Sequence, residues 1–71
     1  MIRLRVKEIL EEQGRSKYWL YKELGYSYQN TNSIIENKTK QIRFETIEAL
    51  ARILNCPVGD LFEVSNDPDD G

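Results

Sequence analysis

Two Gly-x-Ser triplets, at residues 14–16 and 25–27, divide the first half of this chain into short segments. Glycine readily takes the left-handed conformation that ends a helix. Serine is favoured immediately before a helix, because its hydroxyl accepts a hydrogen bond from one of the first free backbone N–H groups. Each triplet therefore predicts the end of one helix and the start of the next. The segment between the triplets has room for only about two helical turns.

The apolar residues around these breaks recur at the three- and four-residue spacing of a helical face. No segment shows the alternation of a half-buried strand, so no strand is expected. Asn55 and Pro57 mark the end of the longest apolar pattern. We therefore predict an all-α domain. Its five helices are expected at residues 2–13, 17–24, 28–36, 44–54 and 58–62.

Each predicted helix places apolar residues on one face, and these faces predict the core. The segment at residues 44–54 has the strongest apolar stripe. The expected core residues are Ile2, Val6, Ile9, Leu10, Leu20, Leu24, Thr31, Ile34, Ile35, Phe44, Ile47, Leu50, Ala51, Leu54, Val58, Leu61 and Phe62.

The size and composition of the chain exclude several classes of function. With 71 residues it forms one small domain at most. A single cysteine, Cys56, excludes an internal disulfide, and the absence of histidine excludes a zinc site of the usual kind. No apolar run approaches the ~20 residues of a membrane span, and the N-terminus lacks the pattern of a signal peptide. We expect a cytoplasmic protein without metal or cofactor and, lacking histidine and a glycine-rich phosphate loop, no catalytic residues and no enzyme activity.

Charge is unevenly distributed along the chain. The net charge is −2, but residues 15–43 hold six basic and two acidic side chains, a local excess of +4. Residues 63–71 hold four acidic side chains and no basic one. We therefore expect a helical domain at residues 1–62, whose basic middle suits phosphate contacts, followed by an acidic flexible tail at residues 63–71.

Polar side chains gather in the segment that follows the second triplet. Thr31, Ile34 and Ile35 share one face of the helix predicted there. The amides of Gln29 and Asn30 lie outside that face. Amide side chains are poor core residues, but they can pair with the edges of bases. Two short helices joined by a turn that contains glycine form a helix-turn-helix unit.

Two longer stretches resemble a known family. GRSKYWLYKELGYS (residues 14–27) matches a Gly-x-Ser-x-x-x-Leu-x-x-x-x-Gly-x-Ser frame, and ENKTKQIRFETIEALARILNCPVGDLF (residues 36–62) matches the elements that follow it. Over residues 2–62 the chain resembles the Cro/repressor-type (XRE family) helix-turn-helix DNA-binding domain of bacteria and their phages. The resemblance implies a compact five-helix, lambda-repressor-like fold whose second and third helices form the helix-turn-helix. It also implies a small stand-alone transcriptional regulator, acting as a repressor on double-stranded DNA.

The same resemblance implies which side chains contact DNA. The helix at residues 28–36 would enter the major groove N-terminus first, where an amide can pair bidentately with adenine. The implied contacts are Tyr28, Gln29, Asn30 and Ser33 with bases, and Lys17, Ser27, Lys38, Lys40 and Arg43 with phosphates.

A single domain of this size covers too little DNA for tight specific binding. The resemblance therefore implies a weak homodimer that forms on DNA, on half-sites about one helical turn apart. The contact between the two copies is implied near the loop before the fourth helix and around Pro57, Val58 and Phe62.

Four positions depart from the family's usual pattern. Tyr21 stands where a small residue is usual, so its side chain must turn outward or the second and third helices must separate. Thr31 replaces a usual Ile or Val. Asn37 replaces a usual glycine and, as the residue best able after glycine to take the left-handed conformation, is expected to adopt it. Arg43 replaces the usual Ser or Thr helix cap, at an expected cost of about 1 kcal/mol.

Aromatic residues crowd the helix-turn-helix segment. They can stack on single-stranded bases, form a partner-binding surface, or pack, with Tyr26 in an apolar turn slot and Tyr18 and Trp19 over the first helix. We favour packing, with Trp19 as the exposed exception. The alternative is a helix-turn-helix scaffold used as a protein-interaction module, for example an antitoxin or accessory subunit, with weak or no DNA binding. The absence of Lys and Arg from residues 28–37 and the acidic tail favour that alternative.

Overall fold

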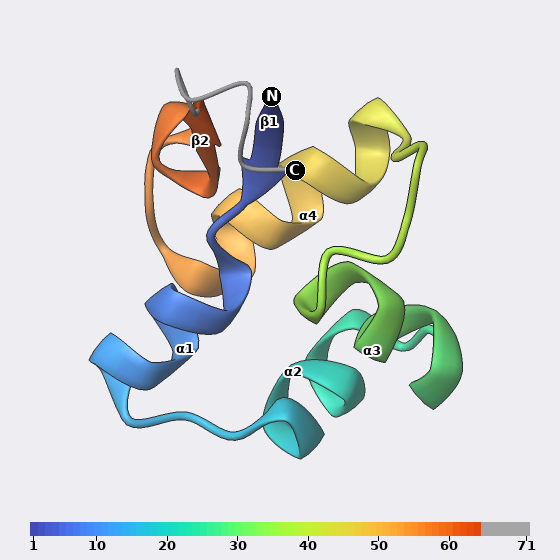
Figure 1. Ribbon diagram of the computed structural model, residues 1–71. Coiled ribbons are helices and arrows are strands. Elements are labelled where there is room, and N and C mark those ends of the chain that lie inside the picture. The colour runs from blue at the N-terminus through green and yellow to red at the C-terminus, as the bar shows by residue number, and fades with distance from the viewer. Residues whose placement is uncertain (65–71) are drawn as a thin grey trace.

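The computed structural model describes residues 1–64, which form four α-helices, one 3-10 helix and a two-stranded sheet (Figure 1). None of the helices in this part of the chain is long and apolar enough to span a membrane. The elements are, in order, β1 (Ile2–Leu4), α1 (Val6–Gln13), α2 (Lys17–Leu24), α3 (Tyr28–Ile35), α4 (Phe44–Leu54), η1 (Val58–Leu61) and β2 (Phe62–Val64).

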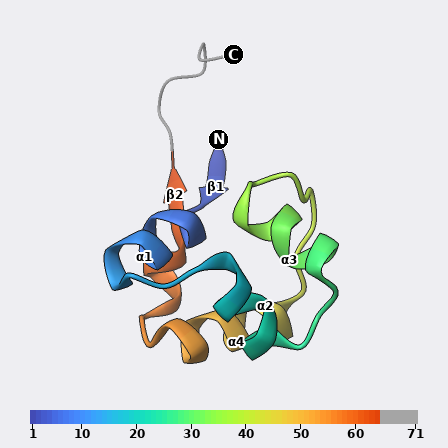
Figure 2. The same ribbon diagram turned by 90° about the horizontal axis from the view of Figure 1, so that it is seen from below.

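Helices α2 and α3 lie side by side on one side of the molecule, and β1, β2 and α1 lie on the other (Figures 1 and 2). Helix α4 packs against α2 and continues into η1. The antiparallel strands β1 and β2 join the two ends of the described chain, with Leu4 opposite Phe62 and Ile2 opposite Val64. The fold is therefore closed by contacts between its first and last elements.

The prediction of five helices and no strands is wrong at both ends of the domain. The first helix begins at Val6, because residues 2–4 form β1 instead of a first helical turn. At the other end η1 is a single 3-10 turn, followed by β2. Strands of three residues are too short to show alternation, and they form only by pairing with each other across the whole domain. Glu63 and Val64, which the sequence assigned to the tail, lie in β2, and the rest of that expected tail lies outside the described residues.

The predicted breaks between helices are confirmed. Gly14 and Gly25 end α1 and α2 with φ angles of 69° and 75°, in the left-handed region. The Ser16 hydroxyl accepts a hydrogen bond from the Trp19 N–H at 3.0 Å, and the Ser27 hydroxyl accepts one from the Asn30 N–H at 3.1 Å. These local signals place α2 and α3 correctly along the chain.

Most predicted core residues are buried, including Leu20, Leu50 and Leu61. Three are wrong: the side chains of Ile2, Phe44 and Val58 are 67%, 85% and 46% exposed.

Phe44 is exposed because the buried position in the first turn of α4 is Thr46, whose hydroxyl hydrogen-bonds with that of Tyr26 at 3.0 Å. Phe44 lies about 200° around the helix from Thr46 and so points to solvent. Thr31 is buried as predicted, and its hydroxyl has no hydrogen-bond partner within residues 1–64.

Candidate nucleic-acid interface

Helix α3 presents two different faces. Thr31, Ile34 and Ile35 are buried against the core. Outside this buried set the side chains of Gln29 and Asn30 are exposed, and neither amide makes a hydrogen bond within residues 1–64. Tyr28 is 48% exposed and Ser33 is half-buried. The first turn of α3 therefore exposes two free amides and one aromatic ring, and their contacts with bases stay a prediction.

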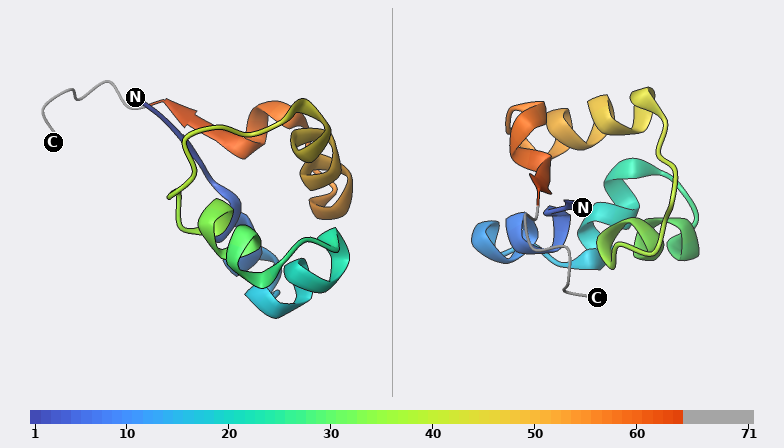
Figure 3. Two further views of the ribbon diagram at one scale, coloured as in Figure 1. Left: turned by 90° about the vertical axis from the view of Figure 1, so that its right-hand side faces the viewer. Right: turned by 45° about the horizontal axis from the view of Figure 1, so that its top comes forward.

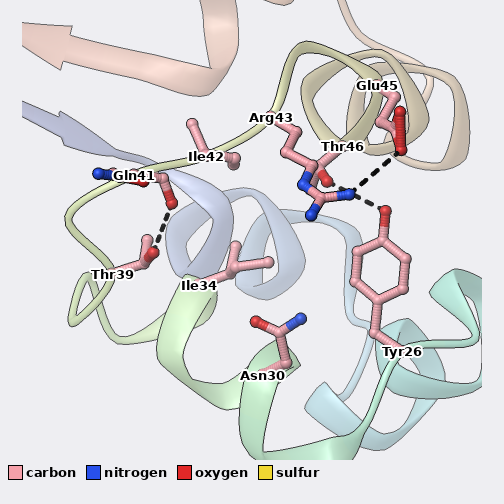
Figure 4. A pocket seen from close by; sticks show the side chains of 9 residues that line it. All are labelled: Tyr26, Asn30, Ile34, Thr39, Gln41, Ile42, Arg43, Glu45 and Thr46. Atoms are coloured by element: carbon pink, nitrogen blue, oxygen red, sulfur yellow. Dashed lines mark hydrogen bonds and ion pairs between the residues drawn. The ribbon is translucent and has the colours of Figure 1, made fainter.

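The chain that follows α3 closes a pocket of about 370 Å³ beside this face (Figure 4). Asn30 and Ile34 line it from α3, and Tyr26 and Thr46 line it where their hydroxyl groups meet. The opposite wall is the loop segment Thr39 and Gln41–Arg43, shaped by a 2.7 Å hydrogen bond from the Thr39 hydroxyl to the Gln41 carbonyl.

The predicted cationic side chains lie on the same segment. Lys38, Lys40 and Arg43 are exposed, and α3 and residues 36–43 face the same side of the molecule (Figure 3, left). Within residues 1–64 neither lysine forms an ion pair. Arg43 lies 4.0 Å from Glu45, with both side chains mostly exposed, and as predicted it gives α4 no side-chain cap. An exposed pair of this kind contributes little, so all three cations can bind an anion.

Lys17 is in a different position. Its Nζ lies 2.6 Å from Oε2 of Glu36, the C-cap of α3, and 3.4 Å from Oδ1 of Asn32 in the middle of that helix. Glu36 is also 3.9 Å from Lys7. The hydrogen bond to Lys17, with the charge of that lysine, lowers the pKa of Glu36, and the same hydrogen bond raises the pKa of Lys17. Lys17 must exchange Glu36 for a phosphate if it is to contact one.

The signs of these pKa shifts define when the pair exists. Because the pKa of Glu36 is lowered in the folded protein, its contribution to stability is present above the ordinary carboxyl value of ~4.3. It is lost as the pH falls through the folded-state pKa. The raised pKa of Lys17 keeps the ammonium charged throughout the neutral range. The pair is therefore intact at neutral pH.

The sequence profile of the Cro/C1-type HTH DNA-binding domain matches residues 5–67, almost the whole chain. The chain belongs to the Cro/C1-type helix-turn-helix family. It is 30% identical to YozG of Bacillus subtilis (strain 168), an uncharacterised HTH-type transcriptional regulator, over 96% of this chain and 81% of YozG. A crystal structure of a candidate DNA-binding protein from Bacteroides fragilis superposes with a TM-score of 0.79 and 27% identity, over 89% of this chain and all of that one.

The position at which Cro/C1-type domains usually carry glycine is Asn37, and its side chain makes two hydrogen bonds that glycine cannot make. Its Oδ1 accepts from the Leu4 N–H at 2.7 Å, and its Nδ2 donates to the Leu4 carbonyl at 2.9 Å. The backbone takes the expected left-handed conformation, with φ of 59°. The amide thus pairs with β1 as a neighbouring peptide group would, and it ties the loop after α3 to the strand.

The aromatic residues are arranged differently from the prediction. Trp19 is partly buried against the core, with the Arg15 guanidinium 4.0 Å from its ring, so it is not the exposed exception. Tyr26 is half-buried, and its hydroxyl hydrogen-bonds with that of Thr46. The exposed aromatic of α2 is instead Tyr18, at 63%. Tyr21 is half-buried, and its ring contacts those of Tyr18 and Tyr28, with centroid distances of 5.9 Å and 5.5 Å.

Two residues near the interface were not predicted. Gln41 is an exposed amide on the wall of the pocket, and Tyr26 contributes its hydroxyl to the pocket's floor. The position of Gln41 between Lys40 and Arg43 was the available signal, since a polar residue inside a phosphate-contacting loop lies within reach of the same ligand. No local signal marks Tyr26, because its partner Thr46 is 20 residues away.

Proposed function

We propose that this protein is a sequence-specific transcriptional repressor that inserts α3 into the major groove of double-stranded DNA. The observation that carries the proposal is that the first turn of α3 holds the free amides of Gln29 and Asn30, and that Asn30 lines one pocket with Arg43 of the cationic loop (Figure 4). A helix that enters the groove N-terminus first brings its initial turn to the base edges. The YozG relative, an HTH-type regulator, supports the same assignment.

The loop after α3 supplies the contacts that position the protein. Lys38, Lys40 and Arg43 bind phosphates, which orients the domain without distinguishing sequences. The hydroxyl of Ser27 accepts from the Asn30 N–H and still has its own proton to donate to a phosphate. The pocket beside α3 leaves room for the sugar-phosphate backbone between the loop and the helix.

A second copy completes the binding site. One module of this size buries only ~600–1,000 Å² on DNA, which gives weak binding by itself. We propose a weak homodimer that forms on a two-fold related site. Two exposed apolar side chains are available for that contact: Phe44, which follows the end of the loop, and Val58.

A titration with duplex DNA at two salt concentrations tests the proposal. We expect the logarithm of the binding constant to fall linearly with the logarithm of the salt concentration, with a slope near −0.9 for each phosphate contacted. The four cations assigned to phosphates predict a slope of about −3.6 for one domain. Binding should be measured by fluorescence anisotropy with random and selected duplexes. Absence of duplex binding at low salt, or binding that does not weaken as the salt concentration rises, would contradict the proposal.

That negative result would favour the alternative function, a protein-interaction module on a helix-turn-helix scaffold. The specific observation in its favour is the exposure of Phe44 and Tyr18, since large exposed aromatics are enriched at protein interfaces.

The pair between Lys17 and Glu36 leads to a prediction about affinity. Glu36→Gln should strengthen duplex binding about two- to fivefold, because Lys17 no longer has to leave a carboxylate to reach a phosphate. The slope of the logarithm of the binding constant against the logarithm of the salt concentration should become steeper by up to about 0.9. Glu11→Gln is the matched control, since it removes the same charge from an exposed position of α1. Equal affinities of Glu36→Gln and the unsubstituted protein would show that Lys17 contacts no phosphate.

A further inference from the structure

The tyrosine cluster, defined as Tyr18, Tyr21 and Tyr28, joins the outer surface of α2 to the first turn of α3. The rings of Tyr21 and Tyr28 meet edge to face, with centroids 5.5 Å apart and an interplanar angle of 79°. Aromatic pairs prefer this geometry, so the contact favours one orientation of the Tyr28 ring. The family's usual small residue at position 21 has no ring to make this contact.

Tyr28 is the first residue of α3, beside Gln29, and about half of its surface is exposed. Its hydroxyl makes no hydrogen bond within residues 1–64. The ring therefore presents an apolar surface, held by Tyr21, in the turn that the proposed function brings to the base edges. A ring of this kind cannot pair bidentately with a base.

The chemistry that matches an apolar surface in the major groove is the 5-methyl group of thymine. It is the apolar group that distinguishes bases there, and contacts with apolar side chains are a known way to recognise it. We propose that Tyr28 recognises a thymine methyl group through its ring, and that Tyr21 is the positioning residue that holds the ring for this contact. The inference rests on the proposed DNA-binding function and names a base that the amides do not specify.

The contact is tested by removing the methyl group from the DNA instead of a group from the protein. A duplex recovered by selection from random sequences is synthesised with each thymine replaced, one position at a time, by deoxyuridine. We expect one position in each half-site at which the unsubstituted protein binds the uracil duplex about fourfold more weakly, the ratio expected for one methyl-sized apolar contact.

Four variants assign that position to the tyrosines. Tyr28→Phe keeps the ring and should retain the fourfold difference, whereas Tyr28→Ala should bind the thymine and uracil duplexes equally. Tyr21→Phe keeps the edge-to-face pair and should behave as the unsubstituted protein. Tyr21→Ala should reduce the ratio toward one while leaving the salt dependence unchanged, an effect that a general loss of folding would not produce. Circular dichroism of each variant shows whether it is folded. If Tyr21→Ala is unfolded, the two Tyr28 variants still test whether the Tyr28 ring contacts the methyl group.

Three results would overturn the inference. If no thymine is sensitive to loss of its methyl group, Tyr28 makes no such contact. If the sensitivity persists in Tyr28→Ala, another residue recognises the methyl group, and if it is lost in Tyr28→Phe, the hydroxyl and not the ring carries the recognition. If the unsubstituted protein binds no duplex, the proposed function is refuted as well. The three results above differ from that outcome, because in each of them the protein still binds DNA.

Discussion

Replacing Asn37 with glycine is expected to lower the free energy of unfolding by about 1–3 kcal/mol, although glycine is the family's usual residue at this position. The substitution keeps the left-handed backbone but removes the two hydrogen bonds to Leu4, each worth about 0.5–1.5 kcal/mol net. Asn37→Ala should lose these bonds and a further ~1–2 kcal/mol, since alanine is disfavoured at a φ of 59°. A domain of this size has only about 4–11 kcal/mol of stability to lose.

The matched control is the other asparagine of positive φ within residues 1–64. Asn55 ends α4 with φ of 56°, and its side chain makes no hydrogen bond within those residues. Asn55→Gly should therefore change stability by less than about 0.5 kcal/mol. Urea denaturation followed by circular dichroism measures all three variants. If Asn37→Gly and Asn55→Gly are equally stable, the two hydrogen bonds to Leu4 contribute nothing to stability. Asn37 then matters only because it tolerates the left-handed backbone conformation.

The parts of this fold that could be predicted depend on neighbouring residues. A serine cap or a left-handed glycine acts within one helical turn, so the last residues of α1 and α2 and the starts of α2 and α3 followed directly from the sequence. The buried face of α3 followed equally well from its spacing. Phe44 was misplaced because an apolar residue at a helix start matches the stripe of the helix, while the buried position there belongs to Thr46 through a contact with Tyr26.

The parts that could not be predicted are pairings between distant residues. Strands β1 and β2 lie about 60 residues apart in sequence and form only together. Asn37 pairs with Leu4, and Lys17 pairs with Glu36, across separations of 33 and 19 residues. The sequence thus indicated that Lys17 and Asn37 occupy significant positions, but not that one is neutralised by a carboxylate or that the other holds a strand.

The largest expected effect on recognition is that of Gln29→Ala. If the Gln29 amide pairs bidentately with a base, its loss should remove about 1–3 kcal/mol of discrimination, or about 5- to 150-fold, at a single position of the binding site. Preference at the other positions should persist, because Asn30 and Tyr28 keep their side chains. Stability should be nearly unchanged, since Gln29 is exposed and makes no hydrogen bond within residues 1–64.

Lys40→Ala is the control that separates base recognition from phosphate binding. Lys40 is exposed and has no ion-pair partner in the described part of the chain, so its removal should weaken binding to all sequences about equally and make the salt slope shallower by about 0.9. Selection from random duplexes followed by titration of each variant measures both effects. If Gln29→Ala weakens every sequence to the same degree, then its amide binds the backbone and not a base. If neither substitution alters duplex binding, α3 and its loop do not face the DNA, because the two side chains with the freest access to it would then contribute nothing.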